Sequence, residues 1–427
     1  MKNLIFLVFV LVFVSCQSTK IMEEKVEKGP SLKFKLSTTG IERKGLWRQN
    51  LCIDDIDMDG NLDIIAPPPR GDNYPVIFLG DGKGNWKEWK EVEFPNLPYA
   101  YGGVDIADID KNGLPDIVFA NHSGRIFVLL QKEKGKFEDF SRGFPNPDKF
   151  SSRVVRFFDF DGDGREEIVS LNESPVTLGT MKRNPIRQRI FKLEGEEWKE
   201  IPLIVENKHH YPPCFGDSLD LGDFDADGRM DFVISCNDLG GKEVVFLYKG
   251  EGFHPKRIDS LPDKSYLYFV KAKDVNKDGR EDIIYAYVTA RLKKEKDMDP
   301  SEAYLAGILV AYNFNEGWEV QKIYERKAGV DYFQFRAVSS GDLNGDGFPE
   351  IVSVLDNGEI FVFLNKDGRN FERANVEGLV KRGRSYWLDI VDLNKDGRND
   401  LIIGYGGEKD GGNLDVYLNE SYELSVR

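Results

Sequence analysis

Seven segments of this chain place oxygen-bearing side chains at a spacing that can bind a hard cation. Each reads Asp-x-Asp/Asn-x-Asp/Asn-Gly-x-x-Asp/Glu, and the copies occupy residues 55–63, 108–116, 159–167, 223–231, 274–282, 342–350 and 392–400. Calcium takes six to eight oxygen ligands, and a tight loop can supply most of them. The sixth position is glycine in every copy, which suits a sharp turn with positive φ. The pattern therefore predicts seven Ca²⁺ sites with a structural role.

The predicted ligands lie at positions 1, 3, 5, 7 and 9 of each copy. Positions 1, 3, 5 and 9 offer side-chain oxygens, whereas position 7 varies in type and is expected to use its main-chain carbonyl. The full set is Asp55, Asp57, Asp59, Asn61, Asp63, Asp108, Asp110, Asn112, Leu114, Asp116, Asp159, Asp161, Asp163, Arg165, Glu167, Asp223, Asp225, Asp227, Arg229, Asp231, Asp274, Asn276, Asp278, Arg280, Asp282, Asp342, Asn344, Asp346, Phe348, Glu350, Asp392, Asn394, Asp396, Arg398 and Asp400.

Three other interpretations of these segments are weaker. An EF-hand shares the opening residues but needs a glutamate at position 12 and flanking helices; position 12 here is never acidic, as Ala66 and Phe119 illustrate. Ordinary Asx-rich turns would explain one copy, but not seven copies in register. Magnesium keeps more of its water and binds fewer carboxylates than calcium.

The spacing of the copies predicts the fold. Their first aspartates lie 50 to 68 residues apart, and about fifty residues accommodate four short strands and their turns. An apolar, β-branched run follows each copy, and later runs carry an aromatic residue near the start of a fourth strand. We predict an all-β, seven-bladed β-propeller of four-stranded antiparallel blades. The run at 32–36 precedes the first blade, and we expect it to complete the last blade and close the ring.

On these loops the chain resembles the FG-GAP/VCBS repeat family, whose best-known members are the β-propellers of integrin α subunits. The resemblance covers residues 31–427, and it implies that each loop joins the first and second strands of a blade. The Gly-Ala-Pro element of the family survives only as Ala66-Pro67, and every blade here carries the acidic loop. Adhesion, scaffolding and carbohydrate chemistry all occur on this fold, so the resemblance implies the architecture more than the function.

The first thirty residues predict export and a lipid anchor. A basic start and the apolar run 4–14 form a signal peptide over residues 1–15, too short to span a bilayer. Phe13-Val14-Ser15-Cys16 resembles a bacterial lipobox, so Cys16 is the expected lipidation site and residues 16–30 the tether. The expected location is the bacterial cell envelope, with plain secretion as the alternative.

Composition limits the partners. The formal charge of −15 leaves no basic field for nucleic acid, and seven bound Ca²⁺ ions would offset nearly all of it. The lipid would be the only membrane contact of a monomeric propeller. Of the remaining cysteines, Cys52 is expected in the core, whereas Cys214 and Cys236 could form a disulfide or stay as buried thiols.

The face opposite the metal loops is where the blades differ, and we expect a protein or glycan ligand there. Two insertions, 172–189 and 289–303, lengthen this face. Aromatic and basic residues enter the blades on the same side, and such residues dominate interaction hot spots. The candidates are Trp47, Tyr101, Arg153, His209, His210, Tyr211, Tyr268, Phe335, Arg384, Tyr386 and Trp387. The opposing interpretation is that these aromatics pack between blades.

The function expected from the sequence is a binding, adhesion or scaffold module at the envelope. The alternative is a polysaccharide-processing enzyme, a lyase or hydrolase, with His209 or His210 as base. The sequence shows no nucleophile motif and no carboxylate pair outside the loops. We therefore assign no catalytic residues.

Overall fold

A computed structural model describes residues 31–122, 124–147, 150–172, 188–201, 217–235, 242–262, 265–289, 304–327, 334–407 and 412–421. The expected signal peptide, tether and Cys16 lie outside these residues, as do most of the two insertions, the His209–Tyr211 segment, Cys214 and Cys236. The described residues contain no helix that could cross a membrane.

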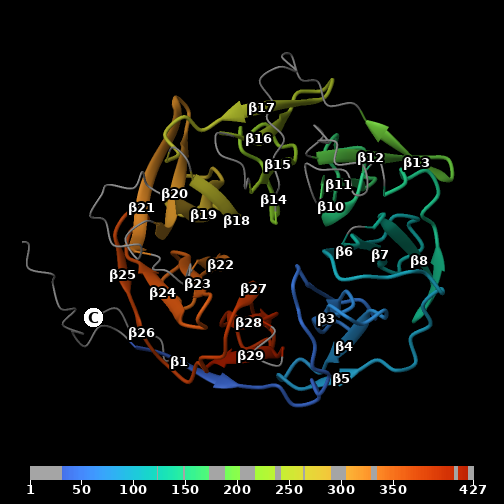
Figure 1. Cartoon of the computed structure of the whole chain (residues 1–427), viewed down its shortest axis with the longest axis horizontal. Helices are drawn as coiled ribbons and strands as arrows, with labels where there is room; N and C mark the ends of the chain where they lie inside the picture. Colours follow the sequence, from blue (N-terminus) through green and yellow to red (C-terminus); the bar gives the residue numbers. More distant parts are fainter. Residues whose placement is uncertain are drawn as a thin grey trace, which may run out of the picture.

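The described residues form seven sheets arranged as blades around a central axis (Figure 1). Blades 1 to 3 are β2 (Cys52–Asp54), β3 (Asp63–Ala66), β4 (Val76–Gly80), β5 (Trp86–Glu88); β6 (Val104–Ala107), β7 (Asp116–Phe119), β8 (Phe127–Glu133), β9 (Lys136–Asp139); and β10 (Ser152–Phe158), β11 (Glu167–Asn172), β12 (Gln188–Glu194), β13 (Glu197–Ile201). Blades 4 to 6 are β14 (Leu219–Gly222), β15 (Asp231–Ile234), β16 (Glu243–Tyr248), β17 (Phe253–Arg257); β18 (Ser265–Lys273), β19 (Asp282–Thr289), β20 (Leu305–Phe314), β21 (Gly317–Lys327); and β22 (Phe335–Gly341), β23 (Glu350–Leu355), β24 (Ile360–Asn365), β25 (Phe371–Arg373). Blade 7 contains β27 (Ser385–Val391), β28 (Asp400–Tyr405) and β29 (Leu414–Asn419).

The N-terminal strand closes the ring, as predicted. β1 (Ser31–Leu36) pairs antiparallel with β29, with Phe34 opposite Asn419, so the first described strand is the fourth strand of blade 7. Figure 1 shows this strand beside β29, at the seam between the two ends of the ring. The sequence did not indicate β26 (Asn375–Glu377), which pairs parallel with β1 and makes this sheet five-stranded. β26 covers the main-chain groups that β1 would otherwise expose as a free edge.

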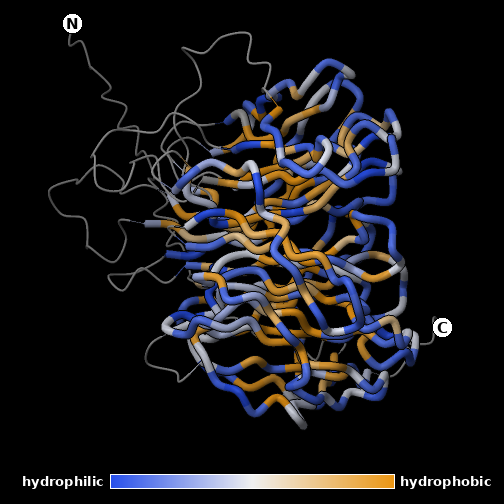
Figure 2. Tube along the Cα trace, turned by 90° about the vertical axis from the view of Figure 1, so that its right-hand side faces the viewer, coloured by the Kyte–Doolittle hydropathy of each residue, from blue (hydrophilic) through white to orange (hydrophobic). Residues whose placement is uncertain are grey.

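Packing between blades explains the apolar runs. The second strand of each blade is enclosed on both faces by neighbouring blades, and β3, β7 and β15 are buried at every position. Strands covered on both faces carry apolar residues at successive positions, rather than alternating apolar and polar residues. Figure 2 shows hydrophobic residues concentrated inside the ring and hydrophilic ones towards its rims. Of the fourth-strand aromatics predicted from the sequence, Trp86, Trp198 and Phe253 are at most 5% exposed, whereas Trp318 and Phe371 are half-buried.

Candidate metal loops, central channel and opposite face

Each acidic loop joins the first and second strands of its blade, as the family resemblance implied, and is organised by its own first carboxylate. In blade 1, Asp55 Oδ2 accepts a hydrogen bond from the Gly60 main-chain N–H at 2.7 Å, and its Oδ1 accepts one from the Asp59 N–H at 3.0 Å. The same bond from the sixth position to the first carboxylate recurs in all seven loops, at 2.7–2.9 Å.

Two residues of each loop adopt the left-handed conformation. The glycine at position 6 does so in every copy, at φ between 79° and 88°. Position 4 does so as well, although it is glycine only in blades 3 and 6 (Gly162 and Gly345); elsewhere it is Met58, Lys111, Ala226, Lys277 and Lys395. The position 4 requirement was not predicted, because non-glycine residues tolerate this conformation only at some cost. The two left-handed residues turn the chain so that its carboxylates converge.

The ninth position anchors each loop to the blade. Asp63 is fully buried, and its two oxygens accept main-chain N–H groups from Ile56 in the loop (3.1 Å) and Gly80 at the end of the third strand (2.8 Å). Equivalent pairs of bonds hold Asp116, Asp231, Asp282, Glu350 and Asp400. Burial raises the pKa of Asp63 to about 7, because the charged form loses water.

Carboxylates converge closely enough to hold a divalent cation. Among the described residues, four loops bring positions 1, 3 and 9 within 4.8 Å of one another: Asp55, Asp57, Asp63; Asp108, Asp110, Asp116; Asp159, Asp161, Glu167; and Asp223, Asp225, Asp231. The other three loops have asparagine at position 3, which supplies an amide oxygen instead. In blade 4, Asp225 pairs with the Lys249 ammonium, which also lies 3.9 Å from Asp227 Oδ2, so a cation already faces these carboxylates. Arginines at position 7 turn to the side, as the Arg229–Asp227 ion pair of 2.7 Å shows.

Buried amides tie neighbouring loops together, which the sequence analysis missed. Asn365 ends β24 and donates to the main-chain carbonyls of Val275 in the blade 5 loop (2.9 Å) and Pro349 in its own loop (3.2 Å). Among the described residues, the same position holds Gln131, Asn313 and Asn419 in three other blades, with the same pair of acceptors. We call this pair of hydrogen bonds between neighbouring loops the latch. Its sequence signal was an amide residue at the end of the third strand.

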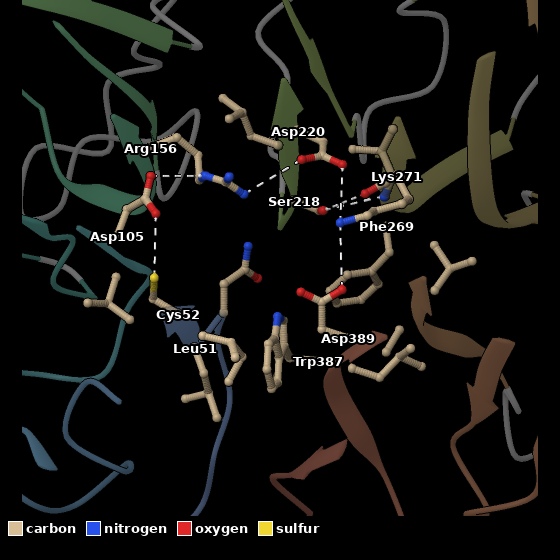
Figure 3. Close-up of a pocket in the computed structure, with 18 of the residues that line it drawn as sticks. Leu51, Cys52, Asp105, Arg156, Ser218, Asp220, Phe269, Lys271, Trp387 and Asp389 are labelled. Atoms are coloured by element: carbon tan, nitrogen blue, oxygen red, sulfur yellow. Dashed lines mark hydrogen bonds and ion pairs between the residues drawn. The ribbon is translucent and has the colours of Figure 1, made fainter. Parts of the chain in front are cut away.

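A ring of polar side chains lines the central channel, where a cavity of about 190 Å³ lies. Six blades contribute the residue three positions before their first loop aspartate to its lining: Cys52, Asp105, Arg156, Asp220, Lys271 and Asp389. The equivalent residue of blade 6, Ser339, is buried and donates to Asp389 Oδ1 at 3.0 Å. Arg156 lies 3.1 Å from Asp105 and 3.6 Å from Asp220, and Lys271 lies 3.7 Å from both Asp220 and Asp389 (Figure 3). Alternating charges thus join the inner edges of five blades.

Cys52 lies at the boundary between this ring and the core, since it lines the cavity and also packs against the apolar cluster of blades 1 and 2. Its side chain is only half-buried, and its Sγ donates to Asp105 Oδ1 at 3.7 Å. Burial, with a smaller contribution from Asp105, raises the thiol pKa well above its ordinary value. The innermost strand faces the channel, so a residue that follows an apolar pattern can still meet water there.

The predicted ligand-face residues divide into two groups. Trp47 and Phe335 are 1% and 0% exposed and pack between blades, and Trp387 is 9% exposed and lines the channel. These three aromatics therefore follow the opposing interpretation. His209, His210 and Tyr211 lie outside the described residues. Tyr101, Arg153, Tyr268, Arg384 and Tyr386 remain partly accessible on the face opposite the metal loops.

Three of these, Tyr268, Arg384 and Tyr386, belong to what we call the arginine–tyrosine cluster: Arg48, Tyr268, Arg336, Arg384 and Tyr386 around Asp356. The buried Asp356 carboxylate lies 3.0 Å from Arg384 and 3.4 Å from Arg336. The Arg336 guanidinium lies 4.7 Å from the ring centre of Tyr268, and that of Arg48 lies 5.5 Å from the ring centre of Tyr386. The cluster spans blades 5, 6, 7 and the entry to blade 1. Arg336 and Asp356 were not predicted.

The comparisons with known proteins agree with this architecture. Cartilage acidic protein 1 of Mus musculus is 26% identical over 227 residues, covering 50% of this chain and 32% of that protein. Integrin alpha-7 of Homo sapiens is 21% identical over 322 residues, covering 68% and 26%. The chain thus spans about a third or less of these curated relatives. A crystal structure of BBS1N in complex with ARL6DN, soaked with mercury, superposes with a TM-score of 0.50 at 11% identity, covering 90% of this chain and 95% of that one.

A family model described as the FG-GAP-like repeat matches residues 55–119, 108–170, 223–285 and 342–403. Each match begins at the first aspartate of a loop and ends in the second strand of the next blade. Together they span more than half of the chain. The chain therefore belongs to the FG-GAP-like repeat family.

Proposed function

We propose that this protein is an exported, lipid-anchored, calcium-binding propeller that binds a protein or glycan ligand at the bacterial cell envelope. One observation carries the proposal: the two faces of the ring are built differently. The loop face repeats one acidic motif with nearly the same hydrogen bonds in every blade. The opposite face carries the arginine–tyrosine cluster, which has no counterpart repeated around the ring among the described residues.

Calcium is proposed as a structural ion. The loops place hard oxygen ligands within a few ångström of one another, and calcium accepts such irregular, carboxylate-rich sites. Each loop also links two strands of its blade through the buried ninth carboxylate. A bound cation offsets the repulsion of three or four carboxylates and so stabilises the folded ring.

The opposite face is proposed as the ligand surface. Ion pairs with Asp356 and stacking on tyrosine rings hold its arginines in place, so little side-chain entropy is lost on binding. Guanidinium groups and tyrosine hydroxyls are donors that suit carboxylate, sulfate or phosphate groups, which favours an anionic protein segment or an anionic glycan. Integrin alpha relatives support a binding module.

Two experiments test the proposal. In thermal unfolding, EDTA is expected to lower the melting temperature and calcium to restore it; a melting temperature indifferent to both would refute the metal assignment. For the ligand surface, we would compare wild type with Arg48→Glu/Arg384→Glu on an array of acidic glycans and in cross-linking to envelope extract. Lys199→Glu, an exposed charge reversal on the outer strand β13, is the matched control. Equal binding by all three proteins would refute this surface.

The anchor rests on the sequence alone and is tested separately. Cells expressing the full chain and its Cys16→Ser variant would be labelled with a fatty acid that carries a detectable tag. Label in the wild type and none in the variant is the expected result. Equal labelling would refute lipidation at Cys16, and no labelling of either would favour plain secretion.

A further inference from the structure

The loop of blade 3 already contains a cation that belongs to the chain. Lys192 lies in β12, and its Nζ is 2.6 Å from Asp161 Oδ2, 2.8 Å from Asp163 Oδ2 and 3.0 Å from Glu167 Oε1. These three carboxylates are predicted calcium ligands at positions 3, 5 and 9. The ammonium group has three N–H donors, one for each carboxylate. Lys192 thus occupies the centre of the blade 3 loop.

Strand register shows that this lysine is particular to blade 3. Phe191 pairs with Ile168, the residue after the ninth loop position, so Lys192 is the next residue along the third strand. The residues at the equivalent position in the other six blades are Leu79, Leu130, Leu247, Tyr312, Leu364 and Leu418. Each of the other six blades therefore has an apolar or aromatic residue where blade 3 has Lys192.

The ninth carboxylate also differs in this blade. In the other six blades it accepts a main-chain N–H from the end of the third strand, as Asp231 does from Tyr248 at 2.8 Å. In blade 3, Glu167 contacts the Lys192 ammonium instead. Side-chain length does not explain the difference, because the ninth residue of blade 6 is also a glutamate, Glu350, and it accepts the Asn365 N–H at 3.4 Å. A side-chain cation has taken over the anchoring that a main-chain N–H performs elsewhere.

Lysines near other loops do not have this arrangement. Lys132 and Lys134 each pair with one loop carboxylate, Asp110 at 2.7 Å and Asp57 at 3.1 Å, and their side chains are 41% and 53% exposed. Lys249 pairs with Asp225 and lies 3.9 Å from Asp227 in the blade 4 loop, and its side chain is 42% exposed. The Lys192 side chain is 26% exposed and meets three carboxylates. An exposed lysine on one or two carboxylates can turn into solvent when a metal arrives, whereas Lys192 would have to break three ion pairs.

We propose that Lys192 is a built-in substitute for calcium in blade 3, so that this loop stays free of metal at calcium concentrations that fill the other six. The inference rests on the proposed calcium binding and revises its number from seven to six. A tethered ammonium competes at a high effective concentration. Calcium must also displace the ammonium from the carboxylates that calcium itself needs. The free energy of calcium binding to the blade 3 loop is therefore reduced by the cost of breaking three ion pairs.

The test is to count the calcium bound per chain. The full-length protein, its Lys192→Leu variant and a Lys132→Met control are dialysed against the same micromolar free calcium, and metal and protein are quantified. Leucine is the residue of five sibling blades, and Lys192→Met provides a second replacement if Lys192→Leu folds poorly. We expect six equivalents in wild type and in the control, and seven in Lys192→Leu.

Stability supplies a second readout. Without its internal cation, the Lys192→Leu loop carries uncompensated carboxylates, so its melting temperature in EDTA should fall below that of wild type and recover with calcium. Equal, non-zero calcium content in wild type and Lys192→Leu would overturn this inference and leave the calcium proposal standing. No calcium in any variant would overturn both.

Discussion

The buried amide of Asn365 gives a sharp test of how the blades are held together. Its Nδ2 donates to the carbonyls of Val275 and Pro349, and its Oδ1 accepts the Gly368 N–H at 2.6 Å. The side chain is fully buried. Asn365→Ala therefore leaves three buried main-chain groups without this partner and breaks the link between the loops of blades 5 and 6.

The expected loss follows from those three groups. Each unsatisfied buried group costs about 1–3 kcal/mol, and water entering the vacated space recovers part of it, so the total is about 3 kcal/mol. Unfolding entropy of about 2 cal/mol/K per residue amounts to about 0.8 kcal/mol/K for a chain of this length, which converts the loss into a fall of about 4 °C in melting temperature.

Thermal and urea unfolding in excess calcium would measure this change. Asn370→Ala is the matched control, because among the described residues that amide bonds only the exposed Asp367, at 2.8 Å; we expect it within about 0.5 kcal/mol of wild type. Asn313→Ala, which breaks the latch between blades 4 and 5, should repeat the larger loss. A loss for Asn365→Ala no greater than that of Asn370→Ala would refute the latch.

Three further substitutions test other parts of the ring. Phe34 in β1 is 2% exposed, so Phe34→Ala should lower the free energy of unfolding in urea by about 3–5 kcal/mol. The control is Lys35→Ala at the neighbouring exposed residue, which should cost less than about 0.5 kcal/mol, as surface substitutions usually do. Equal effects would argue against β1 as an integral strand. Asp220→Asn removes the carboxylate between the two channel cations and should cost about 2 kcal/mol at low salt; the difference should shrink as salt is added, and a salt-independent loss would contradict an electrostatic origin. Gly113→Ala would place its Cβ where no atom lies within 4 Å, at φ of 88°, so calorimetry should show a loss of about 1 kcal/mol from backbone strain alone; an unchanged melting temperature would show that the loop relaxes.

Most of the architecture could be predicted from the sequence, because the same loop and strand pattern recurs in every blade. Seven copies of one loop fixed the number of blades, and the apolar runs after them fixed the second strands. The run at 32–36 could be assigned to blade 7 by counting strands, and the pairing of Phe34 with Asn419 confirms that assignment. Local patterns of this kind are readable because turn chemistry and strand periodicity act over a few residues.

Only the tertiary structure shows which side chains from different blades contact one another. Arg156 and Asp220 are 64 residues apart in sequence but 3.6 Å apart in the channel, and Trp47 looks like a surface aromatic until its neighbours cover it. Lys192 is one of many lysines in the chain, and only strand register places its ammonium within the blade 3 loop. The sequence by itself determined the repeated unit. Closing the ring decided which unlike residues face one another, because those contacts join segments that no local pattern connects.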